Sequence, residues 1–151
     1  MKLVVVAVAA LALQGATFKA TFVGGGHTPP INTRWPYTVK VTDGKGKPLA
    51  ARITAVVVDP VGGVHPVEFF ATIVPKPAPP RCPPNWVMDS STNPPMCKKY
   101  VTNYPIKGTF KDAIIWPPES GGYALTFKVT VRVGTAKKVL KYVLTPQLPA
   151  S

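Results

Sequence analysis

Two histidines and a few carboxylates are the side chains of this sequence that could bind a metal ion. His27, His65 and Glu119 fall in or beside expected loops, with Asp59 and Glu68 on either side of the second histidine. Imidazole and carboxylate groups are common ligands of zinc and copper. No H-x-H or H-E-x-x-H spacing accompanies them, so the alternative is that both histidines cap loops by hydrogen bonding. A metal-binding accessory domain using His27, His65 and Glu119 is therefore one hypothesis.

Catalytic chemistry has less support. A hydrolytic site needs a nucleophile aligned with a histidine. Ser120 stands in Glu-Ser-Gly-Gly rather than in the G-x-S-x-G context of a nucleophile elbow. We therefore predict a protein that is not an enzyme and that uses no cofactor.

The two cysteines point to different chemistry. Cys82 and Cys97 flank a proline-rich segment, and a disulfide between them would restrict the unfolded chain by about 3 kcal/mol in the loop-entropy model. Two cysteines without nearby histidines make a poor metal site, and free thiols are the remaining alternative. We predict the disulfide, which exported proteins can keep.

Cations and aromatic side chains gather in this segment and in the turns expected at the same end of the fold. A stiffened loop loses less entropy on binding, and interfaces favour aromatic and arginine anchors. The alternative is an inserted loop that packs onto its own domain. The candidate binding residues are Lys45, Lys47, Arg81, Trp86, Lys98, Lys99, Tyr100, Lys137 and Lys138.

The overall charge bears on the partner. The chain has 18 Lys and Arg residues against 6 Asp and Glu residues, a formal net charge of +12. Such a surface favours anionic partners, although a basic protein without a dedicated anion site is the alternative. Neither a basic helix nor base-stacking aromatics are evident, which argues against nucleic acid. The expected partner is an acidic envelope polymer or a protein. A structural subunit that assembles through edge strands is a further alternative.

The elements that must position these residues are strands. Residues 123–133 alternate apolar and polar side chains, which is typical of a strand with one buried and one exposed face in an antiparallel sheet. Seven short strands at regular spacing favour an all-β fold, a single immunoglobulin-like antiparallel β-sandwich. Residues 74–106 break the rhythm, are expected to lack regular secondary structure and form the disulfide-closed, proline-rich insertion. The predicted strands are 16–23, 35–42, 51–58, 64–73, 109–116, 123–133 and 138–145.

Alternating strands place successive loops at opposite ends of the sandwich. The loops that hold His27, His65 and Glu119 then share one end, and the cationic turns share the other end with the insertion. The predicted organisation is a sandwich over residues 17–145, which holds the insertion 74–106, and a flexible tail over residues 146–151.

The N-terminus indicates the compartment. Met1 and Lys2 precede an apolar run from Leu3 to Leu13 with small residues beyond it, a pattern typical of a secretory signal peptide over residues 1–16. A buried first strand is the alternative. The run is too short to span a bilayer, so we predict no stable membrane span and a secreted or envelope-associated protein.

Several short motifs carry a resemblance to a known group. The motifs are His-Thr-Pro (27–29), Trp-Pro-Tyr-Thr-Val-Lys-Val-Thr-Asp (35–43), Gly-Lys-Pro (46–48), Gly-Gly-Val-His-Pro-Val-Glu (62–68), Trp-Pro-Pro-Glu-Ser (116–120) and Leu-Thr-Phe-Lys-Val-Thr-Val (125–131). With these motifs the chain resembles uncharacterised secreted proteins of high-GC Gram-positive bacteria that are similar to immunoglobulin-like sandwiches. The resemblance implies fold and export and carries no activity, and the cysteine-bearing segment 75–100 departs from it.

Overall fold

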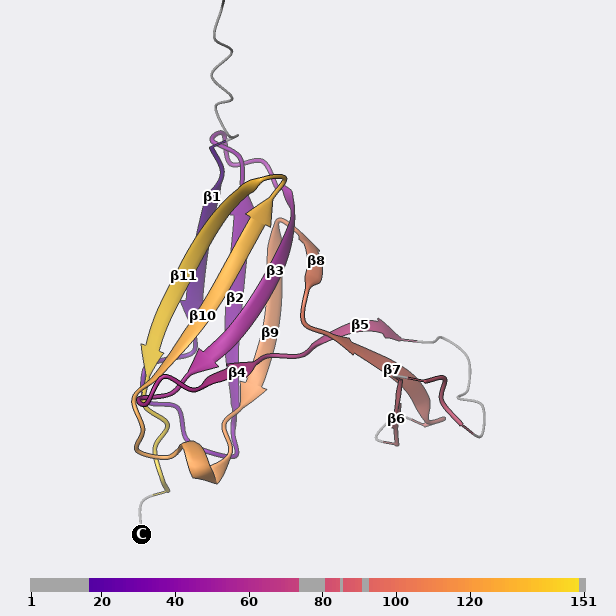
Figure 1. Ribbon diagram of the computed structural model, residues 1–151, viewed down its shortest axis with the longest axis vertical. Helices are drawn as coiled ribbons and strands as arrows, with labels where there is room; N and C mark the ends of the chain where they lie inside the picture. Colours follow the sequence, from indigo (N-terminus) through magenta and orange to yellow (C-terminus); the bar gives the residue numbers. More distant parts are fainter. Residues whose placement is uncertain (1–16, 74–80, 85, 91–92, 150–151) are drawn as a thin grey trace, which may run out of the picture.

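The structure, a computed structural model, describes residues 17–73, 81–84, 86–90 and 93–149. The predicted fold class is confirmed: the protein is an all-β, immunoglobulin-like sandwich with a disulfide-closed insertion (Figure 1). The predicted signal peptide over residues 1–16 lies outside the described residues.

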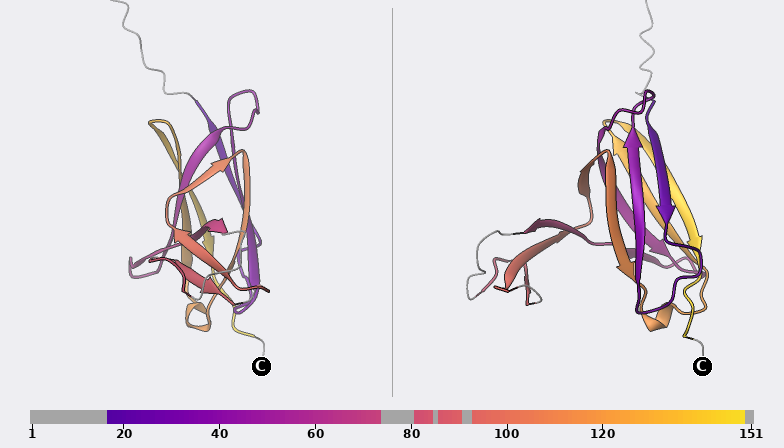
Figure 2. Two further views of the ribbon diagram at one scale, coloured as in Figure 1. Left: turned by 90° about the vertical axis from the view of Figure 1, so that its right-hand side faces the viewer. Right: turned by 180° about the vertical axis from the view of Figure 1, so that it is seen from behind.

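Two antiparallel sheets face each other in the sandwich (Figures 1 and 2). One sheet has the order β1-β2-β9, and the other has the order β11-β10-β3-β4, with β8 also paired to β3. The strands of the first sheet are β1 (Lys19–Gly24), β2 (Arg34–Thr42) and β9 (Thr109–Ile115). Those of the second are β3 (Ala50–Val58), β4 (Val64–Pro66), β8 (Tyr104–Lys107), β10 (Leu125–Val133) and β11 (Ala136–Leu144).

Alternation in the sequence directs one face of each strand into a shared core. Leu125, Phe127, Val129 and Val131 of β10 are buried, as the pattern predicts. Trp35 of β2 contacts Phe127 edge to face at a centroid distance of 5.7 Å, which joins the two sheets. Tyr123 is the exception in the predicted strand: it lies before β10 begins and is 56% exposed.

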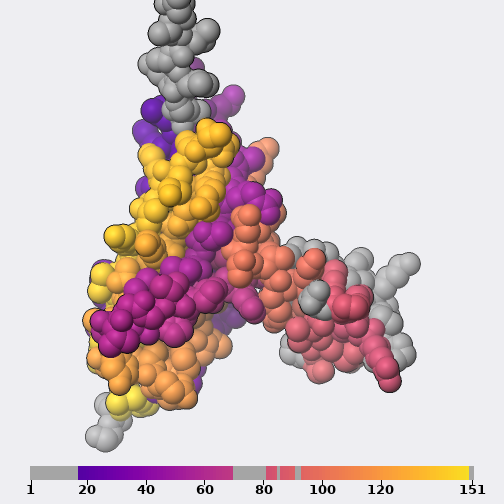
Figure 3. Space-filling model, in the orientation of Figure 1, coloured from indigo at the N-terminus to yellow at the C-terminus, as the bar shows by residue number. Residues whose placement is uncertain are grey.

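Part of the insertion and the strand before it form an arm. The arm is a small antiparallel sheet of order β5-β7-β6 that projects from the side of the sandwich (Figures 1 and 3). Its strands are β5 (Phe69–Ile73), β6 (Val87–Asp89) and β7 (Met96–Val101). The predicted disulfide is confirmed, because Cys82 bonds to Cys97 with a Cα–Cα distance of 5.6 Å.

The arm and the tail correct three expectations. The expected strand 64–73 is two strands, β4 and β5, which belong to different sheets. The insertion 74–106, expected to lack regular structure, holds β6, β7 and β8. The tail is anchored where it begins, because Pro146 is buried and the backbone N–H of Gln147 donates to the Pro29 carbonyl at 2.8 Å. Hydrogen bonds between backbone segments far apart in the chain cannot be predicted from local composition.

Candidate functional site

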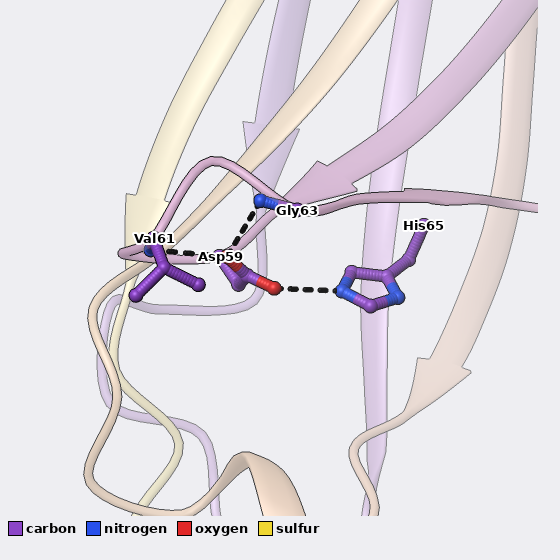
Figure 4. Close-up of polar contacts among 4 residues, drawn as sticks. All are labelled: Asp59, Val61, Gly63 and His65. Carbon is purple, nitrogen blue, oxygen red and sulfur yellow. Dashed lines mark hydrogen bonds and ion pairs between the residues drawn. The ribbon is translucent and has the colours of Figure 1, made fainter.

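The loops after β1, β3 and β9 meet at one end of the sandwich, as the alternation of strands predicts (Figure 1). The turn after β3 is built around Asp59. Its Oδ1 accepts the backbone N–H groups of Val61 at 3.0 Å and Gly63 at 2.8 Å (Figure 4). Gly62 supplies the positive φ of 85° that the turn needs and that other residues rarely adopt. The tight turn brings β4 and His65 back beside β3.

His65 and Asp59 form a pair at this turn. The ring Nε2 of His65 lies 3.0 Å from Asp59 Oδ2 (Figure 4). The hydrogen bond with His65 and the one from the Gly63 N–H hold the pKa of the Asp59 carboxyl below its usual value of 3.8. Asp59 is therefore an anion under ordinary conditions, and its two oxygens serve the turn and the histidine.

A pocket of about 810 Å³ opens beside this pair. Its volume lies within the range of about 300–1,000 Å³ that is common for small-molecule sites. The apolar part of its lining comes from both sheets and from the loop before β10, which contains the short 3-10 turn η1 (Pro118–Ser120). These apolar residues include Val57, Ile114, Trp116, Tyr123 and Leu125.

Carboxylates line the same pocket. Asp59, Glu68 and Glu119 are three of the chain's six acidic residues. Asp59 pairs with His65, whereas Glu68 and Glu119 have no ion-pair partner among the residues that the structure describes. Trp116 is 3% exposed, and its indole N–H has no acceptor within the described part of the chain. The pocket thus combines an apolar lining with negative charge.

The second histidine is placed elsewhere. The His27 ring stacks on Tyr142 with centroids 4.3 Å apart, and its Nδ1 hydrogen-bonds the Val143 carbonyl at 2.5 Å. His65 and Glu119 line the pocket, but His27 does not. Across the described ranges no group of three or more His, Cys, Asp or Glu residues could hold a metal ion. The hydrogen bond and the stacking join the loop that holds His27 to β11, which is the kind of contact that the loop-capping alternative expects.

The predicted binding residues fall into two separate groups. Lys45 and Lys47 lie in the turn after β2, at the end of the sandwich where β11 begins (Figure 1). Lys137 and Lys138 are the second and third residues of β11. Lys138 is engaged structurally, because its Nζ donates to the Phe18 carbonyl and lies 5.0 Å from the centroid of the Phe18 ring. This end of the sandwich therefore has fewer cations free to contact a partner than the sequence indicates.

The other predicted binding residues lie on the arm, which leaves the side of the sandwich rather than its end (Figure 2). Lys98 and Tyr100 are in β7 with Lys99, and Lys98 pairs with Asp89 of β6. Arg81 and Lys99 are exposed, and Trp86 is half-buried. The sequence analysis expected these residues and the turn lysines to form one surface. That expectation is wrong, because the arm has a sheet separate from those of the sandwich.

The structure reveals a cationic face that the sequence analysis did not identify. Arg132 of β10 lies directly opposite Lys137 of β11 on one side and Arg52 of β3 on the other. Four residues along β10, Lys128 lies opposite Lys141. These side chains alternate with the buried positions of their strands, so they share the outer face of the sheet. The cationic face consists of Arg52, Lys128, Arg132, Lys137 and Lys141.

No carboxylate balances the cationic face. All six acidic residues are described, and none lies in β3, β10 or β11. Arg52 is held by neutral groups: its Nε donates to Asn103 Oδ1 at 3.1 Å and its guanidinium to the Asn103 carbonyl at 3.0 Å. Like charges placed directly across strands destabilise a sheet. The sequence shows cations at alternate positions of these strands, which indicates an exposed cationic side of each strand. It does not show which strands pair, so the shared face could not be predicted.

Comparison with known proteins leaves the function open. No protein-family model matches the chain, and no curated protein does. One solved structure that is similar is a DUF4466 family protein from Parabacteroides merdae, with 13% sequence identity and a TM-score of 0.39. The match covers 87% of this chain and 44% of that one, so the chain spans less than half the length of the similar protein. The resemblance to secreted proteins of high-GC Gram-positive bacteria stays a prediction.

Within the described ranges, the chain forms no helix with the length and apolar character needed to cross a lipid bilayer.

Proposed function

We propose that the protein is an exported, non-enzymatic binding module that recognises an anionic polymer of the cell envelope through its cationic face. The observation that carries the proposal is the row of Arg52, Arg132 and Lys137 across three neighbouring strands. Neighbouring strands are about 4.8 Å apart, so the row concentrates positive charge on a short stretch of surface. A bound chain of anionic groups offsets the repulsion within that row.

Export is the second part of the proposal. The oxidised pair Cys82–Cys97 supports it, since disulfides persist mainly in oxidising compartments. The apolar run from Leu3 to Leu13 supports it from the sequence alone. Edman sequencing of the protein recovered from its host envelope tests this part: a mature N-terminus near residue 17 agrees with the proposal, and an intact Met1 contradicts it.

The binding experiment measures affinity for a defined polyanion, such as poly-L-glutamate, over a salt series. We expect log K to fall linearly with log salt for the wild type, as counterions are released. The variant R132Q/K137Q should bind about tenfold more weakly and show a shallower slope, because two cations are removed. Competition by inorganic polyphosphate then shows whether phosphate serves as well as carboxylate.

A matched control has the same change in charge on the other sheet. Lys40 of β2 and Lys111 of β9 are exposed and face away from the core. The variant K40Q/K111Q should retain affinity within about twofold, because it leaves the row of cations intact. Equal weakening by the two variants would mean that only net charge matters, and the proposal would then be wrong.

A second candidate function is assembly through the arm. Strands β5 and β6 are the outer strands of the arm sheet, and Val87 and Met88 of β6 are 54% and 40% exposed. Exposed strand edges pair with strands of other chains, and charged side chains on the edge prevent this. Sedimentation velocity should then show self-association that is unaffected by salt and is lost in Val87→Lys. The exposed turn variant Val61→Lys is the control and should associate like the wild type.

A further inference from the structure

The pocket beside Asp59 has features that the polyanion proposal does not use. Its lining is mostly apolar, and three of the six acidic residues of a strongly basic chain border it. An anionic ligand would meet Glu68 and Glu119, whose charges no described cation neutralises. The electrostatics of this pocket are therefore opposite to those of the protein as a whole.

The apolar surface indicates what the body of a ligand must be. Val57 and Leu125 come from one sheet and Ile114 from the other, so the lining continues the core between the sheets. Trp116 adds a large ring that is almost fully buried. Exclusion of water from such a lining favours an apolar or aromatic body.

We infer that this pocket binds a small organic cation, with an apolar or aromatic body against Trp116 and Leu125 and an ammonium or guanidinium group toward Glu68 and Glu119. The carboxylate of Asp59 is already shared by His65 and the turn, so Glu68 and Glu119 are the groups that select charge. The volume of about 810 Å³ suits a ligand of drug-like size rather than a polymer.

The test uses three probes with one apolar body: 4-phenylbutylamine, 4-phenylbutanol and 4-phenylbutyrate. Titration into the ¹⁵N-labelled full chain, followed by NMR, locates and measures binding of each. We expect the amine to bind at least about tenfold more tightly than the carboxylate, with the alcohol between them, because only the amine is attracted by the carboxylates that line the pocket. The Trp116 indole signal should shift with the amine.

Variants separate charge selection from simple burial. Glu119→Gln should weaken amine binding about fivefold and leave alcohol binding unchanged, because it removes one charge and keeps the apolar lining. Asp112→Asn is the matched control, since Asp112 accepts the Tyr37 hydroxyl at 3.1 Å outside this pocket. It should leave all three affinities unchanged.

Two results would overturn the inference. One is equal affinity for the amine, alcohol and carboxylate, which would show a pocket without charge selection. The other is that the shifted signals map away from Trp116, Tyr123 and Leu125. Neither result bears on the cationic face, so the polyanion proposal is tested separately by its salt series.

Discussion

The cationic face and the acidic pocket are built in different ways from one chain. The face takes its residues from three strands in regular register, with Arg132 between Arg52 and Lys137. The pocket takes its carboxylates from separate loops: Asp59 follows β3, Glu68 lies between β4 and β5, and Glu119 lies in η1. The paired strands place cations next to one another over the outer face of a sheet, whereas the loops bring carboxylates, which are few in this chain, to one pocket. The two regions should therefore respond to different changes.

The largest expected effect is on the free energy of unfolding, from replacing the buried Trp35 that packs behind both regions. Trp35 is 1% exposed and contacts Trp116 of the pocket and Phe127 behind the cationic face. Replacing it with Ala should lower the free energy of unfolding by about 3–5 kcal/mol through the cavity that remains. Urea denaturation measures the loss. Polyanion and amine binding should weaken together, and loss of only one would show that the regions do not share this support.

Removal of the disulfide should have the next largest effect. The disulfide lies in the arm, which belongs to neither the cationic face nor the pocket. C82S/C97S should destabilise the arm by up to about 3 kcal/mol, because the unfolded loop is no longer closed. Hydrogen exchange should show faster exchange in β7 and unchanged protection in β10. Polyanion and amine affinities should stay at their wild-type values. A loss of either affinity would instead place the arm in that binding site.

A smaller effect of opposite sign is expected within the cationic face. Arg132→Thr removes a cation that lies opposite cations on both neighbouring strands. It should stabilise the fold by about 0.2–1 kcal/mol, most at low salt, while it weakens polyanion binding. Thermal unfolding at two salt concentrations measures the change. Lys111→Thr is the control, since Lys111 lies opposite Thr38 and faces no cation there; a similar gain from it would contradict the role of the row.

The smallest effect concerns the turn beside the pocket. Because the folded-state pKa of Asp59 is lowered, its charge stabilises the turn above pH 3.8, the usual value of the group. That stabilisation is lost as the pH falls below 3.8 and through the folded-state pKa. The protection factor of the Gly63 amide, the ratio of its intrinsic to its observed exchange rate at each pH, should fall over this range in the wild type. In Asp59→Ala the protection factor should already be low at neutral pH, and a high value there would contradict the role of Asp59.

Local patterns predicted much of the sandwich. The alternation through Leu125, Phe127, Val129 and Val131 identified β10 and its buried face, because a strand places successive side chains on opposite sides. The flanking positions of Cys82 and Cys97 indicated the disulfide. The arm was missed because its strands are short and proline-rich stretches of sequence separate them, and β7 keeps its place by pairing with both β5 and β6. Such pairing depends on distant partners.

The candidate sites show the same division. The sequence named His65 and Glu119 as neighbours at one end, and both line the pocket, because alternating strands place their loops at the same end. It grouped His27 with them, but stacking on Tyr142 draws that ring to β11 instead. It joined the arm cations to the turn lysines, which the independent arm sheet keeps apart.

The sequence by itself determined the basic character, the strand faces and the cysteine link, since each depends on composition or on nearby residues. Only the tertiary structure decided that Arg52, Arg132 and Lys137 form one row, because strand order and register are set by packing across the whole core. It also decided that Glu68 and Glu119 border one apolar pocket. Residues far apart in the chain meet only when the two sheets close on each other, and no local pattern records that closure.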